Sequence, residues 1–170
     1  QGKAQVIQQQ AFKLYPETSN KAANPQGDKE NFKKALEKFQ EALAVQSWGN
    51  VGQVSQIYMG HCFYGMKEYD QAIAAYSRCL DGSFRSLALN GLGYCYEAKG
   101  DYAKAAENYQ KVAEGDDKLY QEESMLDLAR CYEALKQKDK ALEVYQKALA
   151  KNPKSRMASF IQWKIGELKG

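Results

Sequence analysis

The sequence is poor in proline, histidine and long apolar runs, and each shortage excludes a class of protein. Only three of its 170 residues are proline, and no proline lies between Pro25 and Pro153, which leaves room for many uninterrupted helices. No run approaches the roughly 18 apolar residues of a membrane helix, so we expect no membrane span. Residues 1–12 lack the pattern of a signal peptide. A membrane anchor that preceded Gln1 and was removed stays an open alternative.

Residues typical of catalysis, metal binding or phosphate binding are also scarce. The four cysteines form no C-x-x-C pair and His61 is the only histidine, so a zinc site is not expected. No glycine-rich phosphate loop follows a strand, because no strand is evident. The neighbouring acids Asp116 and Asp117 fall at a turn, where they suit a helix start. We therefore expect no enzyme activity, no metal and no cofactor.

The charge balance gives little support for nucleic-acid binding. The formal net charge is +3, which is too weak to favour a nucleic-acid partner. The region 136–156 is locally basic, with six lysines and one arginine. Its charges are spaced along an amphipathic helix, so we interpret it as a solvated face. An anionic-surface binder is the alternative, and it predicts binding that weakens strongly with salt.

What the chain does contain is an internal repeat with a period of about 34 residues. Gly60, Cys62, Ala72 and Tyr76 recur 33 residues later, as Gly93, Cys95, Ala105 and Tyr109. A further copy places Cys131, Ala141 and Tyr145 36 residues after their counterparts, and an incomplete copy comes first. A fixed period of this size predicts a stack of two-helix units, which typically binds other proteins.

Apolar residues three or four apart predict helices almost throughout the chain. We expect them at about 3–15, 29–46, 51–66, 68–81, 85–98, 101–114, 119–135, 137–151 and 156–168. These form a single domain, 1–170, with repeats at 3–46, 51–81, 85–114 and 119–151. A closing helix follows at 156–168, and a long polar loop at 16–28 interrupts the first repeat.

The repeated residues have a packing role. A small residue in each helix allows close approach, and an aromatic residue one turn away fills the groove beside it. Cysteine at the equivalent positions 62, 95 and 131 then behaves as a small buried residue, and so does Cys79, which aligns with Ala42 and Ala148. We therefore expect four buried free thiols. We also interpret Trp48 and Trp163 as packing residues that cover the junction between units and the closing helix.

The third unit carries the most specific motif, L-x-x-L-G-x-x-Y at 89–96 followed by GDYAKAAENYQ, and the fourth ends at Pro153. This constellation resembles the tetratricopeptide repeat family. The resemblance implies an all-α, right-handed superhelix that acts as a non-catalytic scaffold for protein or peptide partners. More narrowly, the chain is similar to bacterial envelope repeat proteins with one N-terminal anchor. This narrower resemblance implies a periplasmic location with the anchor removed from this sequence. Without such an anchor, the expected location is the cytoplasm.

The residues left outside the repeat pattern are the candidates for partner binding. They lie on first helices, on the face that lines the concave surface in this family, where rigid aromatics with polar groups suit recognition. Glu97, Asp127 and Glu133 project from comparable positions. The alternative is an amphipathic surface with no ligand. Our candidate contacts are Tyr58, His61, Tyr64, Asn90, Tyr94 and Arg130.

Other residues bear on two narrower functions, a chaperone-tail clamp and self-assembly. A chaperone-tail clamp requires basic residues on successive concave faces, but Glu123 and Asp127 stand there and would repel a terminal carboxylate. Self-assembly through the closing helix is a structural rival, and it would use Phe160, Ile161 and Trp163.

Overall fold

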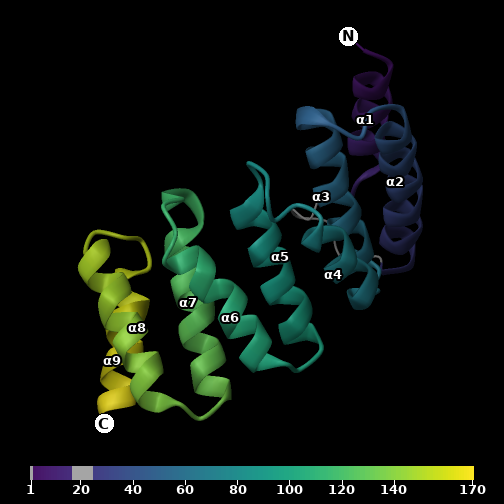
Figure 1. The fold of residues 1–170 in the computed structure, drawn as a ribbon. Helices are drawn as coiled ribbons and strands as arrows, with labels where there is room; N and C mark the ends of the chain where they lie inside the picture. Colours follow the sequence, from purple (N-terminus) through teal and green to yellow (C-terminus); the bar gives the residue numbers. More distant parts are fainter. Residues whose placement is uncertain (1, 17–24) are drawn as a thin grey trace. The chain divides into compact units, whose positions relative to one another are not determined.

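The computed structural model describes residues 2–16 and 25–170 and is all-α over these residues (Figure 1). None of the described helices is long and apolar enough to cross a membrane. The helices are α1 (Lys3–Leu14), α2 (Pro25–Val45), α3 (Gly49–Gly65), α4 (Tyr69–Ser77), α5 (Arg85–Ala98), α6 (Tyr102–Ala113), α7 (Lys118–Ala134), α8 (Lys138–Lys151) and α9 (Ala158–Lys169).

The predicted helices are confirmed, with two differences in their limits. Helix α2 begins at Pro25, earlier than expected, so the end of the predicted loop 16–28 is helical. Proline suits the first turn of a helix, where its missing N–H would have no partner. Helix α4 ends at Ser77 instead of near 81. Residues 17–24, the rest of the predicted loop, lie outside the described residues.

The turn between the two helices of a repeat has the same geometry in three repeats. Lys67, Gly100 and Lys136 occupy equivalent positions and have φ of 62°, 78° and 61°. In each copy the N–H of this residue donates to the carbonyl three residues back, and the next N–H donates to the carbonyl five residues back. This is the hydrogen-bonding pattern of an α-helix whose C-terminus is closed by a residue in the left-handed conformation. Gly100 has the left-handed conformation that glycine adopts most readily, and the Asp101 side chain caps α6 by accepting from Lys104 N at 3.1 Å.

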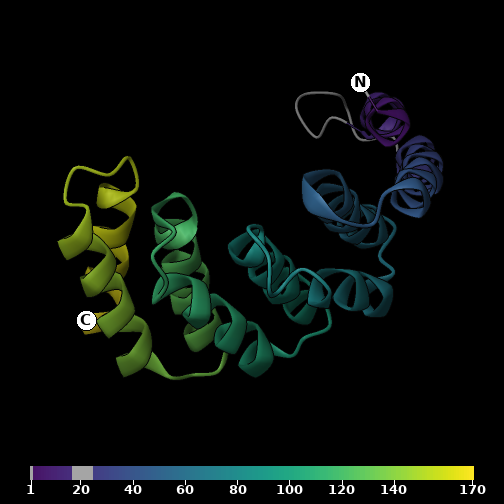
Figure 2. The same cartoon turned by 45° about the horizontal axis from the view of Figure 1, so that its top comes forward.

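The described chain groups into two compact units, Gln1–Cys95 and Tyr96–Gly170, and the boundary falls inside α5. Within the first unit α1 packs on α2, α2 on α3 and α3 on α4. Within the second unit α6 packs on α7, α7 on α8 and α8 on α9, as the turned view shows (Figure 2). The single domain 1–170 stays a prediction.

The core of each unit follows the repeat. Tyr76, Tyr109 and Tyr145 are almost fully buried, at equivalent positions of α4, α6 and α8. The ring of Tyr76 lies so close to Gly60 and Gly91 that a Cβ at either glycine would come within 2.5 Å of it. The expected burial of all four cysteines is confirmed, and none of these four forms a disulfide.

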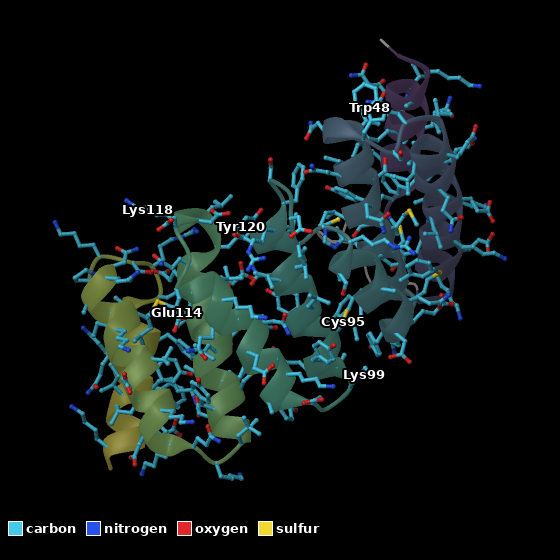
Figure 3. The ribbon with its side chains drawn as sticks, in the orientation of Figure 1. Trp48, Cys95, Lys99, Glu114, Lys118 and Tyr120 are labelled. Carbon is cyan, nitrogen blue, oxygen red and sulfur yellow. The ribbon has the colours of Figure 1, made fainter. Side chains whose placement is uncertain are left out.

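Three expectations about bulky residues are wrong. Trp48, labelled in Figure 3, is 74% exposed because it lies in the turn that precedes α3, so it covers no junction between units. Trp163 is 58% exposed on α9 and therefore does not cover that helix. Ile161, proposed as a self-assembly contact, is completely buried. Its side chain belongs to the inner face of α9, whereas Phe160 lies on the exposed face.

Candidate functional site

In the first unit, Tyr58 is part of an aromatic cluster and is only partly exposed. Its ring stacks on Phe39 at 5.3 Å between centroids and meets Phe12 and Tyr15 edge-on at 4.8 and 5.3 Å. These partners come from α2, from α1 and from the end of α1. The interrupted first repeat therefore supplies a helix whose aromatics pack on Tyr58. The tyrosine holds α1 on α3 in addition to any contact it makes with a partner.

His61 adjoins the same cluster and is held by a buried tyrosine. Its Nδ1 lies 2.6 Å from the Tyr76 hydroxyl, and its ring meets Tyr58 edge-on at 5.2 Å. Burial lowers the pKa of His61 to about 4, because the surrounding rings solvate an imidazolium poorly. At neutral pH the ring is uncharged. The Tyr76 hydroxyl donates to Nδ1 if the proton is on Nε2.

Tyr64 and Tyr94 form a second aromatic group, on α3 and α5. Their ring centroids are 6.5 Å apart, and Tyr64 also lies 5.6 Å from Tyr69. Tyr64 is 38% exposed, whereas Asn90, one turn from Tyr94, is buried. Of the candidates in this unit, the Tyr64–Tyr94 pair offers the most surface to a partner.

In the second unit, Arg130 belongs to a network on the first-helix face. Its Nη2 donates to Glu97 Oε1 at 2.7 Å and its Nη1 lies 2.8 Å from Asp127 Oδ1. The same Glu97 oxygen accepts from the Tyr109 hydroxyl at 2.7 Å. Glu97 of α5 thus joins α6, the second helix of the same repeat, to α7, the first helix of the next repeat. Arg130 keeps 54% of its side chain exposed.

The same arrangement of hydrogen bonds recurs in the next repeat. Glu133 accepts from the Tyr145 hydroxyl at 2.7 Å and from Lys164 Nζ at 2.9 Å. Glu133 follows Glu97 by 36 residues, as Tyr145 follows Tyr109, and Lys164 of α9 stands where Arg130 stands in α7. The role of Lys164 was missed from sequence, although its spacing of 34 residues from Arg130 was a usable signal.

Arg130, Glu133 and Lys164 line a groove of about 610 Å³ within the second unit. Its charged lining residues are Glu123, Asp127, Arg130, Glu133 and Lys164. Its apolar lining residues include Leu126, Met157 and Phe160. The described residues contain no group of three or more His, Cys, Asp or Glu side chains that could hold a metal ion.

Comparison with known families shows what kind of protein carries these faces. Two models of the tetratricopeptide repeat match the chain, one over residues 84–153 and one over 59–81. Together they cover more than half of the sequence. The chain belongs to the tetratricopeptide repeat family. Tetratricopeptide repeats generally serve as non-catalytic protein-interaction scaffolds, and the chain has a repeat-scaffold fold of this kind.

Solved structures of other tetratricopeptide repeat proteins share the fold at low sequence identity. A repeat protein from Parabacteroides merdae has a TM-score of 0.74 and 16% identity; the match covers 98% of this chain and 60% of that one, so this chain spans less than two thirds of it. A putative kinesin light chain repeat protein from Podosopora anserina has a TM-score of 0.64 and 17% identity, with 96% and 84% covered. The MamA RS-1 double mutant has a TM-score of 0.68 and 16% identity, with 99% and 96% covered. A search of curated protein sequences finds no match.

Proposed function

We propose that this chain is a non-catalytic adaptor that binds an extended peptide or a partner helix along the faces of its first helices. The observation that carries the proposal is the Tyr64–Tyr94 pair. These tyrosines lie outside the repeat pattern, yet their rings are 6.5 Å apart and Tyr64 is 38% exposed. Tyrosine offers a large, rigid contact area with a polar end, which is why it is enriched where proteins bind one another.

The proposal is tested by panning a phage-displayed library of random peptides over the full chain. Peptides recovered from the native chain are then measured against a Tyr64→Ala/Tyr94→Ala double variant by fluorescence anisotropy. We expect the double variant to bind at least about tenfold more weakly, because two aromatic contacts are lost. Trp48→Ala, which removes an exposed aromatic from the turn before α3, is the control and should leave binding unchanged. Unchanged binding by a folded double variant would refute the assignment of this face.

Self-association through α9 is a second candidate, supported by the exposed aromatics of that helix. Phe160 and Trp163 are 40% and 58% exposed, and their ring centroids are 6.0 Å apart. Because Ile161 is buried, the contact would consist of Met157, Phe160 and Trp163. Sedimentation velocity over a wide concentration range tests it. A monomer at every concentration excludes this assembly, and a dimer that Trp163→Ala abolishes supports it.

A role in the bacterial envelope rests on the narrower family resemblance. The complete gene tests it: an apolar segment of about 20 residues upstream of Gln1 would support the role, and a complete protein without one would remove its basis.

A further inference from the structure

The carboxylate of Asp127 is the one buried side-chain group in the described chain that is incompletely hydrogen-bonded. Its side chain is only 9% exposed, and Oδ1 pairs with Arg130 Nη1 at 2.8 Å. Among the described residues, Oδ2 has no hydrogen-bond partner. Buried polar atoms are nearly always paired, so each exception calls for an explanation such as a binding role. Burial raises the pKa of this carboxyl group, which is the effect of the same incomplete solvation.

Asp127 lines the 610 Å³ groove of the second unit, and the groove carries an excess of negative charge. Glu123, Asp127 and Glu133 line it with Arg130 and Lys164. Both bases are already engaged by carboxylates outside the lining, Arg130 by Glu97 and Lys164 by Glu167. Their charge is therefore shared, and the groove favours a cation over an anion.

The lining of the groove also includes apolar side chains that are partly exposed. Met157 and Phe160 at the start of α9 are 38% and 40% exposed, and Leu126 of α7 lies with them along the groove. A ligand of the right chemistry therefore carries a positive charge beside an apolar group. Lysine and arginine residues next to a large apolar residue have this combination.

We propose that this groove binds a lysine or arginine side chain of an extended partner peptide, with the cation at Asp127 Oδ2 and a neighbouring apolar residue on Met157 and Phe160. The inference rests on the proposed adaptor function and specifies its partner. Because Oδ2 is covered, a side chain of the wall has to turn for the cation to reach it.

The test uses the phage-displayed random peptide library described above, panned over the full chain at low salt. We expect recovered peptides to share a lysine or arginine beside an apolar residue. A synthetic acetylated and amidated peptide of that sequence is compared with its copy in which norleucine replaces the lysine or arginine. The cationic peptide should bind at least about tenfold more tightly to the native chain. On the Asp127→Asn variant, which has a side chain of the same shape without the charge, the cationic peptide and its norleucine copy should bind equally.

The control variant is Glu143→Gln. Glu143 is an exposed carboxylate of α8 that pairs with Lys147 at 2.7 Å, and this variant should keep the full difference. The peptide comparison needs no protein variant, so it remains decisive if Asp127→Asn does not fold. Peptides without a shared cation, or norleucine peptides that bind equally well, overturn the inference. If such peptides still depend on Tyr64 and Tyr94, the adaptor function survives. Recovery of no peptide at all overturns both.

Discussion

At the scale of single residues, the closest packing in the first unit is that of one tyrosine between two glycines. Tyr76 is 2% exposed, and its ring atoms occupy the space where side chains at Gly60 and Gly91 would begin. Both glycines are helical, so they are present for the close approach and not for an unusual backbone angle. Glycine weakens a helix by roughly 0.5–1 kcal/mol relative to alanine, and here packing offsets that cost.

We predict that Gly60→Ala destabilises the first unit by about 1–3 kcal/mol, because the new methyl group overlaps a ring that has no space to move into. The measurement is urea unfolding followed by circular dichroism. Gly166→Ala in α9 is the matched control, since a Cβ there meets nothing within 4 Å. That control should be neutral or up to about 1 kcal/mol more stable. Equal stabilities of the two variants would contradict the prediction.

His61 is the second residue whose surroundings determine its behaviour. Its pKa is about 4 in the fold against 6.5 for a free imidazole, because burial disfavours the charged form. The unfolded chain therefore binds the proton more readily between these two values. The resulting stabilisation is complete above pH 6.5 and is lost as the pH falls toward 4.

We predict that acidification from pH 6.5 to pH 4 lowers the free energy of unfolding by up to about 3 kcal/mol through His61 alone. His61→Gln should lack this contribution. Since His61 is the only histidine, its ring signals in an NMR titration report it without ambiguity. A midpoint near 6.5 in the folded protein would show that the ring is solvated and would contradict the prediction.

At the scale of helices, two glutamates hold the second unit together, because each carboxylate accepts hydrogen bonds from side chains of two other helices. Glu97 of α5 accepts from Tyr109 of α6 and Arg130 of α7. Glu133 of α7 does the same with Tyr145 of α8 and Lys164 of α9. Each carboxylate therefore connects three consecutive helices on the face that carries the groove. The network fixes the groove wall as well as the stacking.

We predict that Glu97→Ala destabilises the second unit by about 1–3 kcal/mol, since it leaves a buried tyrosine hydroxyl and one side of a guanidinium without their acceptor. Glu143→Ala removes an exposed ion pair and should leave the stability almost unchanged. Thermal unfolding of both variants measures the difference. If the two variants unfold alike, the network contributes nothing to stacking.

At the scale of the whole molecule, the four cysteines report on burial in both units. Cys62, Cys79 and Cys95 belong to the first unit and Cys131 to the second. Burial raises the pKa of Cys62 and Cys131 to about 12 and that of Cys79 to about 11. The thiolate is the reactive form, so these groups are poor nucleophiles at neutral pH as well as covered by neighbouring side chains.

We predict that the native chain incorporates essentially no iodoacetamide at pH 7.5 within minutes, whereas the chain in concentrated guanidinium incorporates four equivalents. Mass spectrometry of the intact protein counts the labels, and peptide mapping assigns them to a unit. Rapid labelling of any of these cysteines in the native chain would show that its unit opens readily.

The sequence by itself determined the helices, the order of the repeats and the burial of cysteines and repeat tyrosines. It could do so because each unit uses the same small and aromatic residues at the same spacing, which is information local in the chain. The limits of α2 and α4 differ from the predicted ones, because a helix end depends on a few hydrogen bonds. Trp48 was misinterpreted because its type suggested burial, whereas its place in a turn decides its exposure.

Only the tertiary structure decided what the non-repeat residues do. Side chains far apart in sequence come together: Tyr58 enters a cluster with α1 and α2, and Arg130 pairs with Glu97 33 residues earlier. Periodicity places such residues on a face but cannot tell which neighbour they contact, because that depends on distances between helices. The same holds for Asp127, whose unpaired oxygen is a property of its surroundings and not of its position in the repeat.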